Sequence, residues 1–220
     1  PGFVNFYLRD RWVQQQVEAV RQAGPEYGNA DVGQSRRMMV EFVSVNPTGP
    51  VHVGHARGAV LGSALSNILA AAGYDVTREY YVNDAGTQME AFYQSLYARY
   101  KQVLDLPAEL PANGYVGEYI TGLAREIAGA EGPRYVELEE AQAVREIGDI
   151  GREKMVDLIR DDLAQIGVLF DQWFSERTLY QEGRYDEALQ ILRDNGYLSE
   201  RENALWFNST MLGDDKDNVV

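Results

Sequence analysis

The chain of 220 residues contains 45% hydrophobic and 25% charged residues, proportions that are ordinary for a globular protein. Its formal net charge of -14 argues against a nucleic-acid binder that works through bulk electrostatics, because phosphate contacts need clustered Lys and Arg. The sequence has no cysteine, which excludes disulfides and thiolate metal sites and favours a cytoplasmic location. Two histidines alone make a poor metal site, and no apolar run is long enough to cross a bilayer, so we expect no metal centre and no membrane partner.

The two ends of the sequence predict that it is a piece of a longer protein. It begins at Pro1 rather than at a methionine, and it ends at Val219 and Val220, which are typical of the start of a strand. Near the beginning, residues 6–22 carry apolar side chains at the spacing of an amphipathic helix. The following stretch, 23–35, is rich in Gly and other turn-forming residues, and we expect it to be a linker.

Strands and helices alternate after the linker. Residues 37–45 form a nearly continuous apolar run, which predicts a strand buried on both faces, as in parallel sheets. A helix is expected from about Gly54, then a second strand over 74–82 and a second helix over 86–104. This order predicts a parallel crossover. The fold class is therefore expected to be α/β, with the first half of a doubly wound parallel sheet.

The second half of the chain has a different character. After a loop rich in Pro and Gly, helices are expected over 118–128 and 144–166, although two glycines interrupt the second of these. Residues 170–180 predict a strand, 185–193 a helix, and 197–209 a hairpin. We interpret this half as a helical insertion followed by a small α+β piece.

The only two histidines, His52 and His55, lie three residues apart in the loop between the first strand and the first helix of the sheet. This loop follows the carboxyl end of the first strand, and in open α/β sheets ligands bind at the carboxyl ends of the strands. The start of the helix adds free N–H groups and the positive end of a dipole. Gly49 and Gly54 allow close approach by a ligand. Two donors at this place suit phosphate chemistry in which charge develops on oxygen. The alternative is that both are surface or capping histidines.

Glu41 lies inside the apolar run of the first strand. A carboxylate in a buried strand is costly without a partner, and a guanidinium, with its planar fork of donors, is the partner that suits it best. Glu41 could therefore bind the guanidinium group of a ligand. The alternative is an internal ion pair with Arg36, Arg37 or Arg78.

Two further polar residues follow the strands. Asn46 could be a turn residue before a proline, and the residues by themselves assign it nothing more. Asp84 follows the second strand, where it could either cap the next helix or contact a ligand.

The sequence HVGH after NPTGP resembles the HIGH motif of class I aminoacyl-tRNA synthetases. The wider stretch VEFVSVNPTGPVHVGHARGAVLG, with YYVNDAGTQM one helix later, closely resembles the arginyl-tRNA synthetase family. FDQWFSERTLY and ALWFNSTMLGDDKD also look like that family, so the resemblance covers nearly the whole chain.

The resemblance implies a ligase that activates L-arginine with ATP, accompanied by Mg2+, to arginyl-adenylate. The arginyl group is then transferred to tRNA(Arg) for protein synthesis. His52 and His55 match the motif histidines, which bind the ATP phosphates and are catalytic in adenylation. Gly54 matches the glycine on which adenine packs.

The amino acid pocket is implied in the same way. Glu41, Ser44 and Asn46 match positions that line the arginine-binding pocket of the family. For Glu41 the resemblance strengthens what its position in the strand already suggests. For Ser44 and Asn46 the role rests on the resemblance alone.

The resemblance also divides the chain. Residues 1–30 resemble the end of an N-terminal tRNA-contacting domain, 31–104 the first half of a Rossmann-like nucleotide-binding fold, and 105–215 the family's insertion region. Residues 216–220 resemble the start of the return strand. The second half of that fold, the loop resembling KMSKS and the helical anticodon-binding domain lie outside this sequence. We therefore expect tRNA to bind mainly elsewhere and the chain to be inactive alone.

Two other functions remain as alternatives. A nucleotidyltransferase can share the HxGH loop without using tRNA, although the long insertion and the carboxylate at Glu41 argue against it. A non-catalytic binding module is the third interpretation. The sequence downstream of Val220 would distinguish among them.

Overall fold

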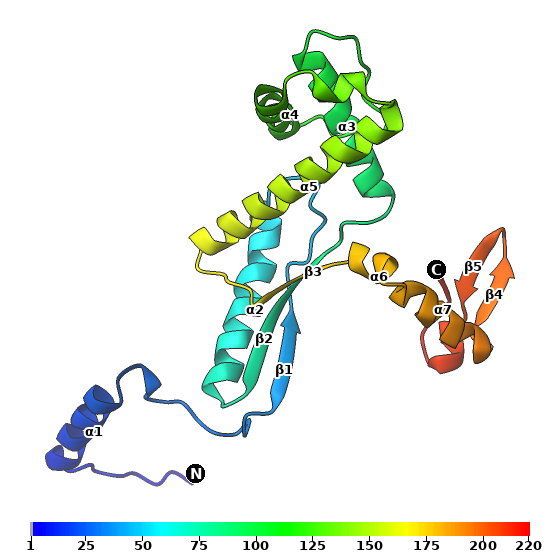
Figure 1. Ribbon diagram of the computed structural model, residues 1–220. Helices are drawn as coiled ribbons and strands as arrows, with labels where there is room; N and C mark the ends of the chain where they lie inside the picture. The colour runs from blue at the N-terminus through cyan, green and yellow to red at the C-terminus, as the bar shows by residue number, and fades with distance from the viewer. Residues whose placement is uncertain (1) are drawn as a thin grey trace. The chain divides into compact units, whose positions relative to one another are not determined.

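The computed structural model describes residues 2–220, whose helices and strands are drawn in Figure 1. These residues divide into two compact units. Unit 1 comprises the described residues up to Val43, together with His52–Tyr80 and Leu163–Gln172. Unit 2 comprises Ser44–Val51, Tyr81–Asp162 and Trp173–Val220. Each unit is described by itself.

Unit 1 contains the predicted parallel crossover. Strand β1 (Arg37–Glu41) pairs in parallel with β2 (Asp75–Val82), and helix α2 (Val53–Ala71) connects the two. The register sets Arg37 opposite Asp75 and Glu41 opposite Glu79. The third strand, β3 (Gln172–Ser175), lies next to β2, so the order in the sheet is β1-β2-β3. The predicted α/β class and parallel pairing are confirmed.

Strand β1 differs from the prediction in length and burial. It ends at Glu41 rather than at 45, because Val43 and Ser44 have φ of 67° and 44°, which no extended strand can contain. The predicted burial on both faces is wrong, since Met39 is 57% exposed and Glu41 is exposed as well. The reason is topological. Within residues 2–220, β1 lies at the edge of a three-stranded sheet, and a continuous apolar run cannot by itself distinguish an edge from the middle of a sheet.

Helix α2 packs on the sheet through its small residues. A Cβ at Gly62 would lie 2.1 Å from Cγ of Phe42, so the glycine allows the helix to approach the end of β1. Phe42 in turn packs against Phe170, with ring centroids 4.4 Å apart and the rings tilted by 32°. The larger apolar residues of the helix, including Leu61 and Ile68, are exposed. The spacing of these apolar residues predicted the helix, but it did not predict which face of the helix packs on the sheet.

Before this sheet, unit 1 contains α1 (Asp10–Ala23) and the short 3-10 helix η1 (Gly24–Glu26). The predicted helix over 6–22 is therefore confirmed in its position, with a start four residues later. None of the residues of α1 is buried.

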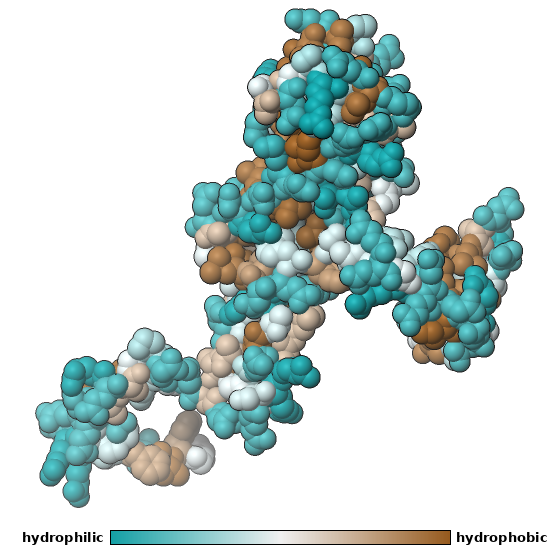
Figure 2. All heavy atoms as spheres, viewed as in Figure 1, coloured by the Kyte–Doolittle hydropathy of each residue, from teal (hydrophilic) through white to brown (hydrophobic). Residues whose placement is uncertain are grey.

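Unit 2 is built around three helices, α3 (Thr87–Val103), α4 (Glu118–Glu131) and α5 (Glu140–Gln165), with the 3-10 helix η2 (Arg134–Glu137) before the last. Their facing side chains form one apolar core. Figure 2 shows the outside of the molecule, where hydrophobic patches lie among hydrophilic residues. The largest fully buried members are Phe92, Leu96, Tyr100, Ile120, Ile127 and Ile147.

Helix α5 continues through the two glycines that were expected to interrupt it, and the reason lies in their packing. A Cβ at Gly148 would lie 2.2 Å from the Tyr93 ring, and one at Gly151 would lie 2.2 Å from Leu96. Each glycine therefore lets α3 and α5 approach closely, and this contact offsets the loss of helix propensity. The helix also begins at Glu140, four residues before the predicted start.

The last part of unit 2 holds α6 (Arg177–Gln181), α7 (Arg184–Asp194), and the antiparallel strands β4 (Leu198–Arg201), β5 (Ala204–Phe207) and β6 (Asn218–Val219). The 3-10 helix η3 (Ser209–Leu212) lies between β5 and β6. The predicted helix and hairpin are confirmed, and the hairpin turn places Glu202 and Asn203 at positive φ, as a type I′ turn requires. The strand expected near Val219 forms as β6, which pairs with β5.

The predicted strand over 170–180 is correct only for its middle. Residues 172–175 form β3, but Arg177–Gln181 is helical. The side chain of Asp84 accepts hydrogen bonds from the Ser175 hydroxyl and from the backbone N–H of Arg177, which holds the turn between strand and helix. A contact across 91 residues of sequence therefore ends the strand, and no local pattern could have predicted it.

Candidate active site

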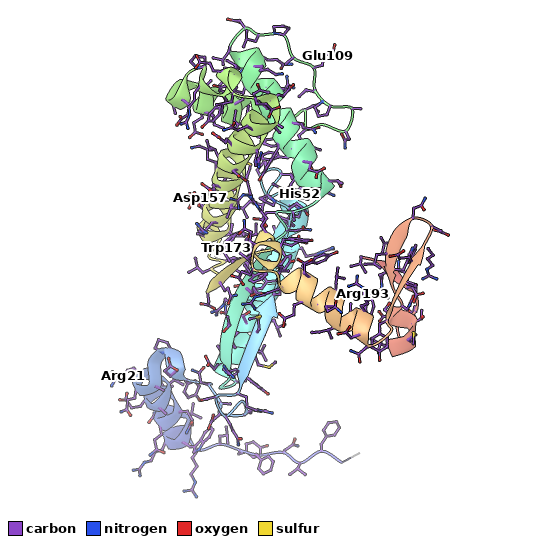
Figure 3. All side chains as sticks on the ribbon, turned by 45° about the vertical axis from the view of Figure 1, so that its right-hand side comes forward. Arg21, His52, Glu109, Asp157, Trp173 and Arg193 are labelled. Carbon is purple, nitrogen blue, oxygen red and sulfur yellow. The ribbon has the colours of Figure 1, made fainter. Side chains whose placement is uncertain are left out.

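The start of α2 holds both histidines in a reciprocal cap. His52 is labelled in Figure 3. His52 is the N-cap residue, and its Nδ1 accepts a hydrogen bond from the N–H of Gly54 at 3.1 Å. The N–H of His52 donates to Nδ1 of His55 at 3.4 Å. The arrangement is a capping box, in which histidines stand where Ser or Thr and Glu or Gln are usual. The histidines are therefore capping residues, as one interpretation of the sequence proposed.

The cap leaves each imidazole with one donor free for a ligand. Because both Nδ1 atoms accept hydrogen bonds, a neutral ring carries its proton on Nε2, which is the tautomer that the network assigns. Partial burial lowers the pKa of His55, and the nearby charge of His52 lowers it further, which keeps that ring neutral near pH 7. Capping and ligand binding thus use different nitrogens and do not exclude each other.

Gly54 is fixed by the same cap. A Cβ at this position would lie 2.9 Å from Cε1 and 3.0 Å from Nδ1 of His52, which is closer than a side chain can normally approach. The glycine therefore keeps room for the capping ring. The free N–H groups and the positive end of the α2 dipole make the same helix start a place for an anion.

The loop that precedes the helix belongs to unit 2, where it is held at several points. The Ser44 hydroxyl accepts a hydrogen bond from the N–H of Tyr81 at 3.1 Å. Pro47 is fully buried, and the carbonyl of Asn46 accepts a hydrogen bond from the N–H of Thr48 at 2.8 Å. Of the three residues predicted to bind arginine, Ser44 and Asn46 lie in this loop, and Ser44 also has a structural contact.

The third predicted arginine contact, Glu41, is the last residue of β1 in unit 1. The alternative was an internal ion pair of Glu41 with Arg36, Arg37 or Arg78. Of these three arginines, Arg78 is already paired with Asp171 at 3.6 Å. The register partner of Glu41 is Glu79, so two carboxylates lie side by side on the sheet. Adjacent like charges are unfavourable, and this favours a cationic ligand at that place. The sequence interpretation missed Glu79, since only the register brings the two together.

Asp84 neither caps α3 nor faces solvent. The N-cap residue of α3 is Gly86, and Asp84 is 2% exposed. Its carboxylate accepts hydrogen bonds from Nη1 of Arg152 at 2.9 Å, from the Ser175 hydroxyl at 2.7 Å, and from the N–H of Arg177 at 3.1 Å. The residue joins the ends of β2 and β3 to α5 within unit 2.

A second carboxylate extends this network. Asp149 accepts hydrogen bonds from the Tyr93 hydroxyl at 2.8 Å and from the guanidinium of Arg177. Burial, followed by the hydrogen bond to Asp149, raises the pKa of Tyr93 far above its ordinary value. Sequence reasoning identified neither Arg152 nor Arg177, because an arginine on a helix of mixed charge carries no signal of a buried partner.

The described residues contain neither a metal-binding cluster nor a membrane-spanning helix. Within residues 2–220, no group of three or more His, Cys, Asp or Glu side chains is arranged to hold a metal ion. Over the same residues, no helix has the length and apolar character needed to cross a membrane.

The sequence is similar to one family of enzymes and to individual members of it. The sequence model of the family described as tRNA synthetases class I (R), catalytic domain, matches residues 16–215. Over all 220 residues, the chain is 50% identical to an arginine–tRNA ligase of Dehalococcoides mccartyi and 48% identical to one of Geobacillus kaustophilus. It spans 40% of the length of each of these relatives.

Solved structures agree as well. A crystal structure described as an arginyl t-RNA synthetase from Campylobacter jejuni superposes with a TM-score of 0.82 at 32% identity, over 97% of this chain and 46% of that one. A Thermus thermophilus arginyl-tRNA synthetase shares the fold, with a TM-score of 0.56 at 22% identity, over 92% of this chain and 35% of that one. Because the family model covers most of the sequence, the chain belongs to the class I tRNA synthetases (R) and carries residues of their catalytic domain.

Proposed function

We propose that this chain is part of an arginyl-tRNA synthetase, an enzyme that joins L-arginine to the adenylyl group of ATP with release of pyrophosphate, and then transfers the arginyl group from arginyl-adenylate to tRNA(Arg). The observation that carries the proposal is the histidine cap at the start of α2, in a chain that is 50% identical to an arginine–tRNA ligase over its whole length. A nucleotidyltransferase that does not use tRNA would not need a carboxylate, such as that of Glu41, to bind a guanidinium group.

His52 and His55 are the proposed catalytic and ATP-binding residues. Each would donate its Nε2–H to oxygens of the ATP phosphates, where negative charge grows as the arginine carboxylate attacks the α-phosphate and pyrophosphate leaves. Donors that are already oriented cost no reorganisation at that moment, which is how they lower the barrier. Gly54 is proposed to carry the adenine, as the family resemblance implies.

Glu41, Ser44 and Asn46 are the proposed arginine contacts. Glu41 would pair with the substrate guanidinium, whose planar donors match a carboxylate. Support comes from its exposed position next to Glu79, where two negative charges are close together. Ser44 and Asn46 are proposed on the resemblance of their positions.

Mg2+ is proposed to arrive with ATP. This ion keeps several waters and commonly binds through substrate phosphates and one or two carboxylates, so it needs no dedicated cage of protein ligands. Contacts with tRNA(Arg) are proposed to lie mainly outside these 220 residues, which fits the strongly negative charge of the chain. A cytoplasmic location is part of the proposal and is supported by the absence of cysteine.

The domain boundaries remain part of this proposal. Residues 1–30 would be the end of an N-terminal tRNA-contacting domain, and 31–104 the first half of the nucleotide-binding fold. Residues 105–215 would be the insertion, and 216–220 the start of the return strand.

Arginine-dependent exchange of pyrophosphate into ATP tests the function. A full-length protein that carries these residues should exchange label only when arginine is present, and neither lysine nor citrulline should replace it. The 220-residue chain alone should sustain no exchange, because it spans 40% of the relatives' length. Exchange that does not depend on the amino acid would contradict the arginine assignment and favour a different nucleotidyltransferase.

A further inference from the structure

The end of β1 and the helix that carries the histidines meet at one close contact within unit 1. Phe42 directly follows Glu41, the last residue of β1. It is buried, and its N–H donates a hydrogen bond to the carbonyl of Glu79 at 3.3 Å. On the helix, Gly62 lies against this ring, because a Cβ there would be 2.1 Å from Cγ of Phe42. These residues and both histidines all belong to unit 1.

The face of α2 that packs on the sheet also carries one of the histidines. The buried residues of the helix are Ala59, Gly62 and Ser66, which recur at helical spacing. His55 precedes Ala59 by four residues, so it lies on the same face at the start of the helix. The small residues let the helix lie close to the sheet, and the position of His55 depends on how close it lies.

The ring of Phe42 is held in place by two further aromatic residues of unit 1. It packs against Phe170, with ring centroids 4.4 Å apart. Tyr80 of β2 meets Phe170 edge to face at 5.4 Å. A close-packed group of this kind has little room to absorb a displacement. Phe42 is therefore a firm spacer between the end of β1 and α2.

The spacing matters for adenylation because the two substrates are proposed to bind at its two ends. Glu41, the proposed contact for the arginine guanidinium, precedes Phe42, while His52 and His55 are the proposed donors to the ATP phosphates. An oxygen of the arginine carboxylate bonds to the α-phosphorus, and pyrophosphate leaves with the electron pair of the broken P–O bond. The reacting atoms must start about 3 to 3.5 Å apart, and a misplacement of about 1 Å can cost about a hundredfold in rate.

We propose that Phe42, packed against Gly62, is a positioning residue for adenylation, which sets the separation between the arginine contact of β1 and the histidines of α2. The inference rests on the proposed function. Phe42 touches neither substrate in this account, because its side chain is buried between the sheet and the helix. A change of this contact should therefore slow the reaction between the two substrates while each of them still binds.

Gly62→Ala in a full-length protein that carries this sequence is the first variant. Its methyl group moves the ring and the helix apart by about 1 Å, since carbon atoms that are not bonded prefer separations of about 3.5 to 4.0 Å. The kcat of arginine-dependent pyrophosphate exchange should fall about a hundredfold. The dissociation constants of arginine and of ATP, each measured alone by calorimetry, should change little.

An analogue of arginyl-adenylate, with a sulfamate in place of the phosphate, supplies the readout that a purely structural role would not move. The analogue joins the arginyl and adenosine groups through a linkage of fixed length, so it must contact both ends of the site at once. Its affinity should fall by about the same factor as kcat, because it resembles the joined state rather than either substrate. Equal losses for arginine, ATP and the analogue would indicate general damage to the fold, and would overturn the proposal.

Gly58→Ala is the matched control on the same helix. A Cβ at Gly58 would meet nothing within 4 Å, and the residue is exposed. The substitution adds the same methyl group and raises the helix propensity. This variant should keep normal exchange kinetics and melt at the same temperature as the wild type or above it. A kinetic loss like that of Gly62→Ala would show that the contact with Phe42 is not the cause, and would overturn the proposal.

Phe42→Leu tests the same contact from the sheet, and it decides the matter if Gly62→Ala does not fold. Leucine removes the ring that packs against Phe170, so the separation changes without a clash. Exchange and affinity for the analogue should both fall about tenfold, while arginine and ATP bind as before. Normal exchange with normal binding of the analogue would overturn the inference alone. A wild type without arginine-dependent exchange would overturn the proposed function, and this inference with it.

Discussion

The rings of His52 and His55 stack with their centroids 3.7 Å apart and 24° between their planes. Each ring uses its Nδ1 as an acceptor in the cap of α2. A proton added to either Nδ1 removes one acceptor of that cap and brings positive charge to the helix end that least favours it. The cap is therefore complete only while both Nδ1 atoms are free to accept these hydrogen bonds.

The first prediction concerns pH. The folded-state pKa of His55 is below the ordinary value of about 6.5 that the unfolded chain would show. The unfolded chain therefore binds more protons, and stability rises with pH in this window. The contribution of His55 is complete above about pH 6.5 and is lost as the pH falls through its folded-state pKa.

Nuclear magnetic resonance of the imidazole nitrogens can check this prediction. Both rings should show the Nε2–H tautomer at pH 7.5, and the midpoint of His55 should lie below that of a histidine in an unstructured peptide. His52→Asn removes the charge of the neighbour and should raise the midpoint of His55. A midpoint at or above the peptide value would show that the ring is not held as described.

The second prediction separates capping from catalysis. Asn is among the best N-cap residues, so His52→Asn should keep the free energy of unfolding within a few tenths of a kcal/mol, whereas His52→Ala should lose about 1 kcal/mol. Both lack the Nε2–H donor, so both should lower the adenylation rate of the full-length protein by roughly two to three orders of magnitude. Urea denaturation and pyrophosphate exchange measure the two effects.

His55 allows the same separation. Gln is usual at this position of a capping box, so His55→Gln should preserve the helix start and still lose most of the activity. Arginine affinity should change much less in all of these variants. If His52→Asn retained normal exchange, the histidines would be capping residues only.

The third prediction concerns Glu41. Glu41→Gln keeps the shape and removes the charge, so arginine binding by the full-length protein should weaken by about 2 to 4 kcal/mol while ATP binding barely changes. Because Glu41 is exposed in this chain, the substitution should change the free energy of unfolding by less than about 0.5 kcal/mol. Calorimetry measures the binding of both ligands.

Citrulline is the matched ligand for this variant, since it is nearly isosteric with arginine and neutral. Its affinity should fall less than that of arginine, which narrows the discrimination between the two. Equal losses for both ligands would mean that Glu41 shapes the pocket without reading charge. No loss for either would remove Glu41 from the arginine site.

The fourth prediction concerns the buried carboxylate of Asp84 and its hydrogen bonds. Asp84→Asn leaves the guanidinium of Arg152 without its carboxylate, and the loss of one member of a buried pair costs about 3 kcal/mol in unfolding free energy. Asp157→Asn is the control, because Asp157 pairs with Arg160 at 2.8 Å on the exposed side of α5 and should contribute less than about 1 kcal/mol. Equal midpoints of urea denaturation would contradict the role of Asp84.

The local pattern of the sequence determined the elements and the motif. Apolar spacing predicted α1 and α2, turn residues predicted the β4–β5 hairpin, and the order of strands and helices predicted the parallel pairing of β1 with β2. The HxGH pattern at a helix start predicted the place of the candidate site. These features depend on neighbours within a few residues, so the sequence alone carries them.

Contacts between residues far apart in the sequence determined where some elements end and which residues pack together. β1 stops at Glu41, and β3 gives way to α6 because Asp84 binds the turn between them. The glycines of α5 are compatible with a long helix only because Tyr93 and Leu96 lie against them. Tyr119 of α4 donates a hydrogen bond to the carbonyl of Thr48, 71 residues earlier in the sequence. Each of these outcomes depends on which side chains meet in space, and a local pattern carries no information on partners far along the chain.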